Sequence, residues 1–89
     1  MKTEKNLRED IGYFIRKSRQ EKALSASQLG ELVKLSQQQI SRYECGITNI
    51  NVDMLNLFLT VLDKTWIDFL FSVIAYHSKE VERLKTQLY

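Results

Sequence analysis

The sequence lacks proline altogether and contains only three glycines and one cysteine among its 89 residues. A single cysteine excludes an intramolecular disulfide, so we expect a reduced, cytoplasmic setting. The longest apolar run, residues 66–75, is interrupted by Asp68 and Ser72 and is too short to cross a bilayer. No segment shows the strict apolar–polar alternation of a half-buried strand. These absences predict an all-α fold, of a size that fits one compact domain.

Positive charge is concentrated at the N-terminal end, although the formal net charge of the chain is only +2. Residues 1–22 carry seven basic and four acidic side chains, residues 23–50 carry two of each, and residues 51–89 carry four basic and five acidic ones. A phosphate-facing surface and an ordinary solvated helix face would both produce this distribution. Charge alone therefore leaves a nucleic-acid partner open.

Two serine capping boxes lie eleven residues apart in the middle of the chain. In each box the serine side chain can accept a hydrogen bond from the backbone N–H of a glutamine three residues later. The glutamine side chain can in turn accept a hydrogen bond from the backbone N–H of the serine. The boxes are Ser25 with Gln28 and Ser36 with Gln39. Gly46 stands where a left-handed helix end is expected. The pattern predicts two short helices joined by a tight turn near residues 34–35, which is a helix-turn-helix.

Apolar residues at helical spacing predict three further helices around this pair. The three are residues 7–22, residues 52–62 behind an Asn51 cap, and a segment that begins after Thr65 with Asp68 in its capping box. The expected inward residues of the first four helices are Leu7, Ile11, Phe14, Ile15, Ser18, Leu29, Leu32, Val33, Ile40, Tyr43, Leu55, Phe58, Leu59 and Leu62.

The helix that begins after Ser36 shows a polar surface if Ile40 and Tyr43 face inward. Its outward residues are then Gln37, Gln38, Ser41 and Arg42. Glutamine donates and accepts at once, which suits an adenine edge, and arginine suits the two acceptors of guanine or a phosphate. A polar surface helix without a partner would show the same residue types, so the pattern alone leaves both interpretations open.

Residues 11–70 resemble the Cro/C1-type (XRE) helix-turn-helix repressors. The matching residues are Ile15-Arg16-Lys17-Ser18-Arg19, Leu24-Ser25, Leu29-Gly30, Leu35-Ser36, Ile40-Ser41-Arg42-Tyr43-Glu44-Cys45-Gly46, Leu55 and Leu62. The Ile-Ser-x-x-Glu-x-Gly segment is the most specific of these motifs. The resemblance implies a five-helix, lambda-repressor-like fold that binds double-stranded DNA.

The resemblance also implies roles for individual residues. It places base reading on Gln37, Gln38, Ser41 and Arg42, backbone contact on Thr48 and Asn49, and a semi-buried ion pair on Arg19 and Glu44. Where the family often has a phosphate-binding glutamine this chain has Ala26, so Ser27 or the helix N-terminus is expected to serve instead. Gly30 stands where the family often has alanine, and Ile50 where it usually has proline. Lys17 is expected to face phosphate.

The run from Ser36 to Glu44 is similar to fimbria-associated regulators of the MrpJ-like group. This narrower resemblance implies a switch between adhesion and motility in enteric bacteria, through repression of flagellar genes. It depends on a single nine-residue segment.

Beyond Thr65, apolar residues alternate spacings of three and four in a heptad stripe. The helix is expected to extend as far as Gln87, although a break near residues 77–78 remains open. Residues 7–70 then form the helix-turn-helix domain and residues 71–89 a helical dimerisation extension. The dimer seam is assigned to Leu70, Ile74, His77, Val81, Leu84 and Leu88.

The stripe has β-branched residues at one core position and mainly leucine at the other, which favours two strands. The alternative is that this helix packs back on its own domain, as the extra apolar faces of Trp66, Phe69 and Phe71 suggest for its first half. In a homodimer, two recognition helices related by a two-fold axis would read half-sites about 34 Å apart.

An enzyme is not expected, because the sequence has no glycine-rich phosphate loop and no serine or cysteine with a nearby histidine. His77 is the only histidine, so neither a metal site nor a cofactor is expected, and Cys45 is expected to be inert. The sequence predicts a cytoplasmic, nucleoid-associated DNA-binding regulator, a dimeric repressor on a palindromic operator, with no membrane or small-molecule partner. The alternative is a protein-interaction module, such as an antitoxin or co-regulator, that binds through its C-terminal helix.

Overall fold

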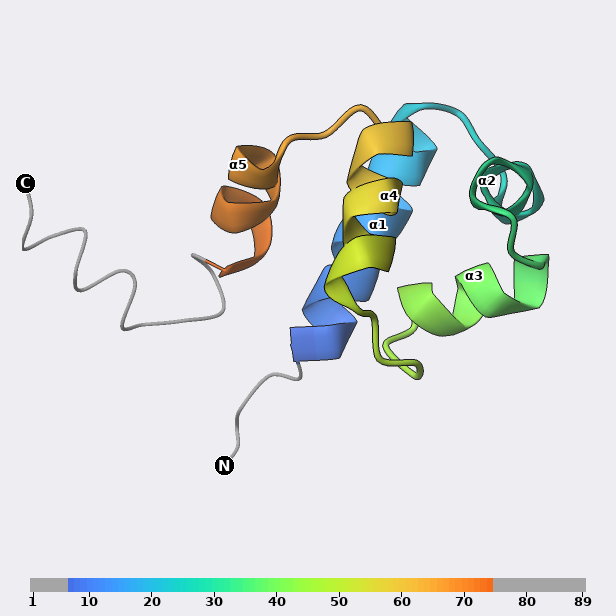
Figure 1. Cartoon of the computed structure of the whole chain (residues 1–89), viewed down its shortest axis with the longest axis horizontal. Coiled ribbons are helices and arrows are strands. Elements are labelled where there is room, and N and C mark those ends of the chain that lie inside the picture. The colour runs from blue at the N-terminus through green and yellow to red at the C-terminus, as the bar shows by residue number, and fades with distance from the viewer. Residues whose placement is uncertain (1–6, 75–89) are drawn as a thin grey trace, which may run out of the picture.

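The computed structural model describes residues 7–74 of the chain, and within that range it is helical with no strand. Its elements are α1 (Leu7–Glu21), α2 (Ala26–Val33), α3 (Gln37–Glu44), α4 (Val52–Val61), α5 (Trp66–Phe69) and a π-helical turn η1 (Leu70–Ile74). The all-α, five-helix fold is therefore confirmed (Figure 1). No helix in the described range is long and apolar enough to cross a membrane.

Local capping sets where the helices begin. Ser25, Ser36 and Thr65 each form the reciprocal capping box that their sequence context predicts. The Asn51 side chain accepts the backbone N–H of Met54 at 2.7 Å and begins α4 in the same manner. In the third box, accepting hydrogen bonds from Thr65 lowers the pKa of the Asp68 carboxyl. These bonds join residues three apart, so they form without help from the rest of the fold.

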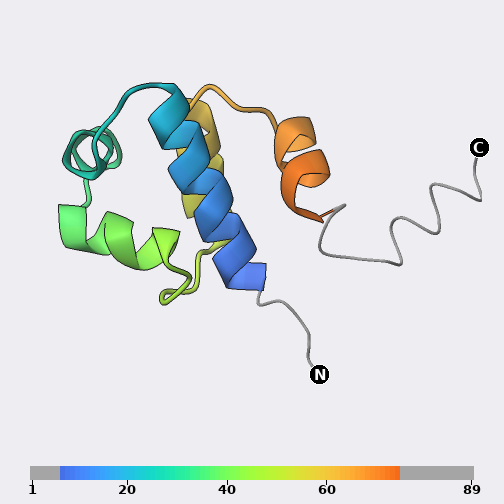
Figure 2. The ribbon, with the colours of Figure 1, turned by 180° about the vertical axis from the view of Figure 1, so that it is seen from behind.

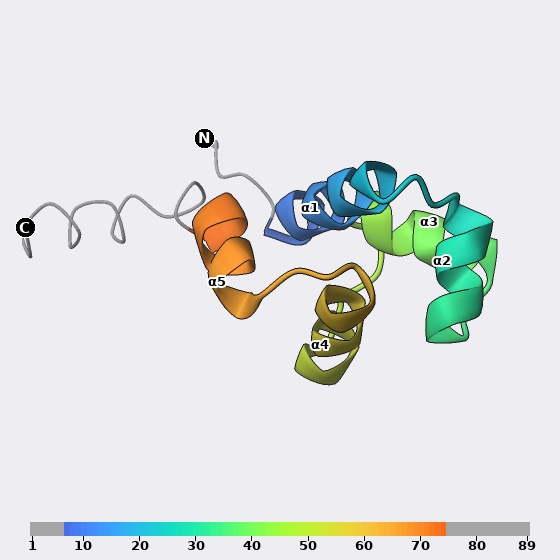
Figure 3. The same ribbon diagram turned by 90° about the horizontal axis from the view of Figure 1, so that it is seen from above.

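The helices enclose a core in two parts, one on each side of α1. Figures 2 and 3 show α2 and α3 at one end of the molecule, α5 at the other, and α1 with α4 between them. The part toward α2 and α3 contains Ile15, Leu29, Val33, Ile40, Phe58 and Leu62. The part toward α5 contains Phe14, Leu55, Leu59, Phe69 and Val73. Edge-to-face ring contacts, Tyr43 with Phe58 and Phe14 with Phe69, add a directional component to each part.

The prediction of an inward Leu32 is wrong, because its side chain is 53% exposed. Leu29, Gly30 and Val33 occupy the inward side of α2. Leu32 precedes Val33 by one position and is therefore turned about 100° away from it. Leu7, also expected inward, is 38% exposed at the start of α1.

The segment after Thr65 differs from the expected regular helix. α5 ends after one turn and continues as the π-helical turn η1, which interrupts the spacing of three and four on which a heptad seam depends. Val73 joins the core, Ile74 is half-buried against it, and Leu70 remains 44% exposed. The other predicted seam residues, His77, Val81, Leu84 and Leu88, lie outside the described residues, as does the expected continuation to Gln87.

Candidate nucleic-acid interface

The exposed side of α3 is the polar helix surface that the sequence predicts. Ile40 is fully buried and Tyr43 half-buried, and these two residues fix which side of the helix faces inward. The opposite side leaves all four predicted base readers exposed and close together, at helix positions one, two, five and six: Gln37, Gln38, Ser41 and Arg42. The structure therefore presents amide, hydroxyl and guanidinium groups side by side on one face, where each can donate a hydrogen bond.

The turn between α2 and α3 requires close approach of the backbone. Lys34 ends α2 in the left-handed conformation, with φ 63°, and the Leu35 N–H donates to the Gly30 carbonyl at 2.8 Å. A Cβ atom built on Gly30 would lie 2.4 Å from the carbonyl oxygen of Leu35. Glycine at this position therefore allows the turn to fold tightly against α2.

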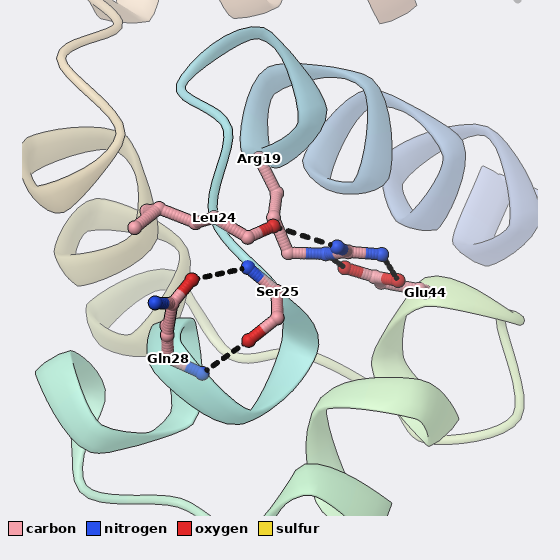
Figure 4. A network of polar contacts seen from close by, with 5 residues as sticks. All are labelled: Arg19, Leu24, Ser25, Gln28 and Glu44. Carbon is pink, nitrogen blue, oxygen red and sulfur yellow. Dashed lines mark hydrogen bonds and ion pairs between the residues drawn. The ribbon is translucent and has the colours of Figure 1, made fainter.

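An ion pair between Arg19 and Glu44 joins α1 to the end of α3 (Figure 4). Arg19 donates from Nε to Glu44 Oε2 at 2.6 Å and from Nη2 to Oε1 at 3.0 Å. The side chains are 13% and 7% exposed, and the hydrogen bond to Glu44 raises the pKa of Arg19. The two parallel bonds fix orientation as well as distance. The structure thus brings together the two residues that were expected to pair, although they are 25 positions apart.

The same guanidinium reaches the loop that leads into α2. Its Nη1 atom donates to the Leu24 carbonyl oxygen at 2.9 Å, and Leu24 directly precedes Ser25, the cap of α2 (Figure 4). One side chain therefore contacts both the beginning of α2 and the end of α3. We infer that Arg19 holds the helix-turn-helix in position against α1.

The loop between α3 and α4 begins directly after the exposed polar side of α3 and touches the start of α1. Thr48 is half-buried and Asn49 is exposed. Asn49 Oδ1 accepts a hydrogen bond from Arg8 Nη1 at 3.2 Å. A Cβ atom built on Gly46 would lie 2.8 Å from the Cα of Glu9, so the loop is in contact with α1. Thr48 and Asn49 therefore lie next to the C-terminal end of α3.

The remaining two predicted phosphate contacts lie in different places. Ser27 is exposed in the first turn of α2, near the free backbone N–H groups of that helix end. Lys17 is not brought to this surface. It lies on a different side of α1, where it lines a small pocket with Lys64 and with Ser72 of η1. The reason is helical geometry: Gly12 faces α3, and a residue five positions later points about 140° away.

Two residues of this region were not singled out from the sequence, Arg8 and Ile47. Arg8 contacts Asn49 across 41 positions of sequence, and no local pattern signals such a contact. Ile47 is 65% exposed and directly follows Gly46, the first residue after the C-cap of α3. A signal existed for Ile47, because it stands two positions past the cap of α3, while the residues three and four places before that cap, Arg42 and Ser41, are polar.

Comparison with known proteins identifies a matching family and two solved structures with a similar fold. A family model described as helix-turn-helix matches residues 15–69, which is more than half of the chain. A crystal structure of the clp gene regulator ClgR from C. glutamicum superposes with a TM-score of 0.78 at 23% sequence identity, covering 88% of this chain and 100% of that chain. Another ClgR structure, from Corynebacterium glutamicum, gives a TM-score of 0.77 at 21% identity, covering 94% and 89%. At these identities the likeness shows the fold alone. No curated protein sequence matches the chain.

Proposed function

Because this chain belongs to the helix-turn-helix family, a family of DNA-binding transcriptional regulators, we propose that it is a dimeric repressor that reads a palindromic operator through α3. The observation that carries the proposal is the exposed polar side of α3, held in place by the Arg19–Glu44 ion pair. A second copy related by a two-fold axis would present the same side to the next major groove.

The contacts are proposed to divide into two kinds. Gln37, Gln38 and Ser41 read base edges, since an amide can both donate to and accept from adenine, while Arg42 pairs with guanine or a phosphate. Ser27 and the loop residues Thr48 and Asn49 bind the phosphate backbone on either side of α3. The N-terminus of α2 adds its partial positive charge to the contact at Ser27.

The proposed dimer would use the C-terminal end of the domain. In the described residues this end exposes large apolar side chains, with Ile67 64% and Leu70 44% exposed. Exposed apolar side chains gathered at one place often mark a protein contact. We propose that His77, Val81, Leu84 and Leu88 extend this contact beyond the described residues, whereas Ile74 is half-buried against the core.

Selection of bound sequences from a random DNA pool, with the purified full chain at fixed moderate salt, tests the proposal. We expect an enriched palindrome whose half-sites are about 34 Å, or one helical turn, apart. Enrichment of a single, non-repeated half-site would refute the dimer, and salt-sensitive binding without enrichment would refute sequence-specific reading. Occurrence of the enriched sequence in flagellar promoters is expected if the chain links fimbrial and flagellar genes.

The second candidate is a protein-interaction module, such as an antitoxin or co-regulator, that binds a partner through its C-terminal end. The exposure of Ile67 and Leu70 favours it as much as it favours a homodimer. This function predicts no enriched DNA sequence for the chain alone, together with a higher unfolding temperature when a partner binds.

Replacing Gln38 by alanine should weaken binding to the selected DNA sequence by about 1–3 kcal/mol and relax the preference at one base pair of each half-site. The cause is the loss of an amide that both donates and accepts at a base edge. Equilibrium titration of the selected sequence and of its single-base variants measures both effects. The control is Thr60→Ala, which removes an exposed polar group from α4, outside the proposed interface. An equal loss of affinity on all sequences would show that Gln38 does not read a base.

A further inference from the structure

Ile47 occupies a fixed position at the end of the recognition helix. The Gly46 N–H donates to the Tyr43 carbonyl oxygen at 3.1 Å, and the Ile47 N–H donates to the Arg42 carbonyl oxygen at 2.9 Å. Gly46 has a φ of +75°. This pair of bonds around a left-handed glycine is the Schellman motif, in which Ile47 is the second residue past the helix cap. The backbone of Ile47 is therefore tied to the same turn of α3 that carries Arg42.

The side chain of Ile47 lacks the partner that this motif usually supplies. A residue at its position normally packs against an apolar residue in the last turn of the helix, three or four places before the cap. In α3 those places are held by Arg42 and Ser41, which are both exposed. Ile47 is accordingly 65% exposed, beside the base-reading side of α3 and outside both parts of the core.

The backbone of the loop around Ile47 is held by α1 and by the end of α3, so the Ile47 side chain has a defined position from which to contact a ligand. Gly46 lies so close to α1 that a Cβ atom there would be 2.8 Å from the Cα of Glu9. The Thr48 N–H also approaches the Arg42 carbonyl oxygen, at 3.4 Å. Because the backbone is already ordered, placing the Ile47 side chain against a ligand costs little additional conformational entropy.

We propose that Ile47 is a specificity-determining residue that packs against the C5-methyl group of a thymine, next to the DNA group that Arg42 contacts. The inference rests on the proposed function, in which α3 enters the major groove. The thymine methyl is the apolar group that base pairs present in that groove, and an aliphatic side chain is the natural partner for it. Ile47 would thereby distinguish thymine from cytosine at one position in each half-site, where the hydrogen-bonding residues of α3 need not reach.

Methyl deletion in the DNA tests this contact. The probe is the enriched duplex from the random-pool selection, with each thymine replaced in turn by uracil, which removes only the methyl group. For the unaltered protein we expect one thymine per half-site at which the replacement weakens binding about fourfold, the effect of burying one methyl group. The Ile47→Ala variant should bind the thymine and uracil duplexes equally at that position, while Ile47→Val should keep part of the difference.

The inference would be overturned by the absence of thymine from the enriched half-site, by the absence of a position sensitive to its methyl group, or by the same sensitivity in Ile47→Ala. Uniform weakening by Ile47→Ala on thymine and uracil duplexes would assign the side chain to the sugar–phosphate backbone and would also overturn it. Failure of the random-pool selection itself refutes the proposed function, whereas success of the selection without a methyl effect refutes only the role of Ile47. Because Ile47 is exposed, the substitution is not expected to unfold the domain.

Discussion

Replacing Arg19 by methionine should lower the free energy of unfolding by about 3 kcal/mol, at the lower end of the range for breaking a buried ion pair. Methionine keeps much of the volume of the side chain, but it leaves the Glu44 carboxylate, which is 7% exposed, without its partner. It also removes the donor to the Leu24 carbonyl oxygen. Urea denaturation followed by circular dichroism measures the change, provided that the slope against urea concentration stays constant.

A second pair in the same domain supplies the control. Lys64 Nζ lies 2.8 Å from Glu21 Oε1, but these side chains are 27% and 57% exposed. Water screens this pair, so Lys64→Met should cost far less stability than Arg19→Met. The double variant Arg19→Met/Glu44→Leu should regain most of the lost stability, because it leaves no unpaired buried charge. Equal costs for Arg19→Met and Lys64→Met would contradict the bracing role of Arg19.

Replacing Gly12 by alanine should destabilise the domain by about 2–3 kcal/mol, the upper range for overpacking. A Cβ atom at this position would lie 2.4 Å from the carbonyl oxygens of both Tyr43 and Glu44. These are backbone atoms, so relief requires α1 and the end of α3 to move apart and disturbs the Arg19–Glu44 pair in turn. Urea denaturation measures the loss, and titration of the selected DNA should show weaker binding by the folded variant.

The direction of the stability change in Gly12→Ala distinguishes the cost of overpacking from the gain in helix propensity. Within an exposed helix, glycine to alanine stabilises by up to about 1 kcal/mol. Gln20→Ala, on the exposed side of α1, changes propensity without a close contact and should alter stability by less than about 0.5 kcal/mol. A Gly12→Ala variant as stable as the parent, or more so, would show that α1 and α3 are less closely packed than the structure indicates.

The sequence by itself determined where the helices begin and which side of α3 faces outward. The capping bonds at Ser25, Ser36 and Thr65 join residues three apart, and their geometry depends only on the local chain. The outward side of α3 follows from the helical period once Ile40 is inside. Both depend on interactions within a few residues, so the residues alone were sufficient to predict them.

Only the tertiary structure decided which exposed groups share a surface. It left Leu32 exposed, placed Lys17 beside a pocket shared with Lys64 and Ser72, and introduced the π-helical turn after Phe69. It also set the contact between Arg8 and Asn49, 41 positions apart. These features depend on how the helices pack against one another, because contacts between distant segments depend on the volume and position of every neighbour in the core. Helical periodicity and capping motifs involve only residues close together in the sequence, so they cannot predict these contacts.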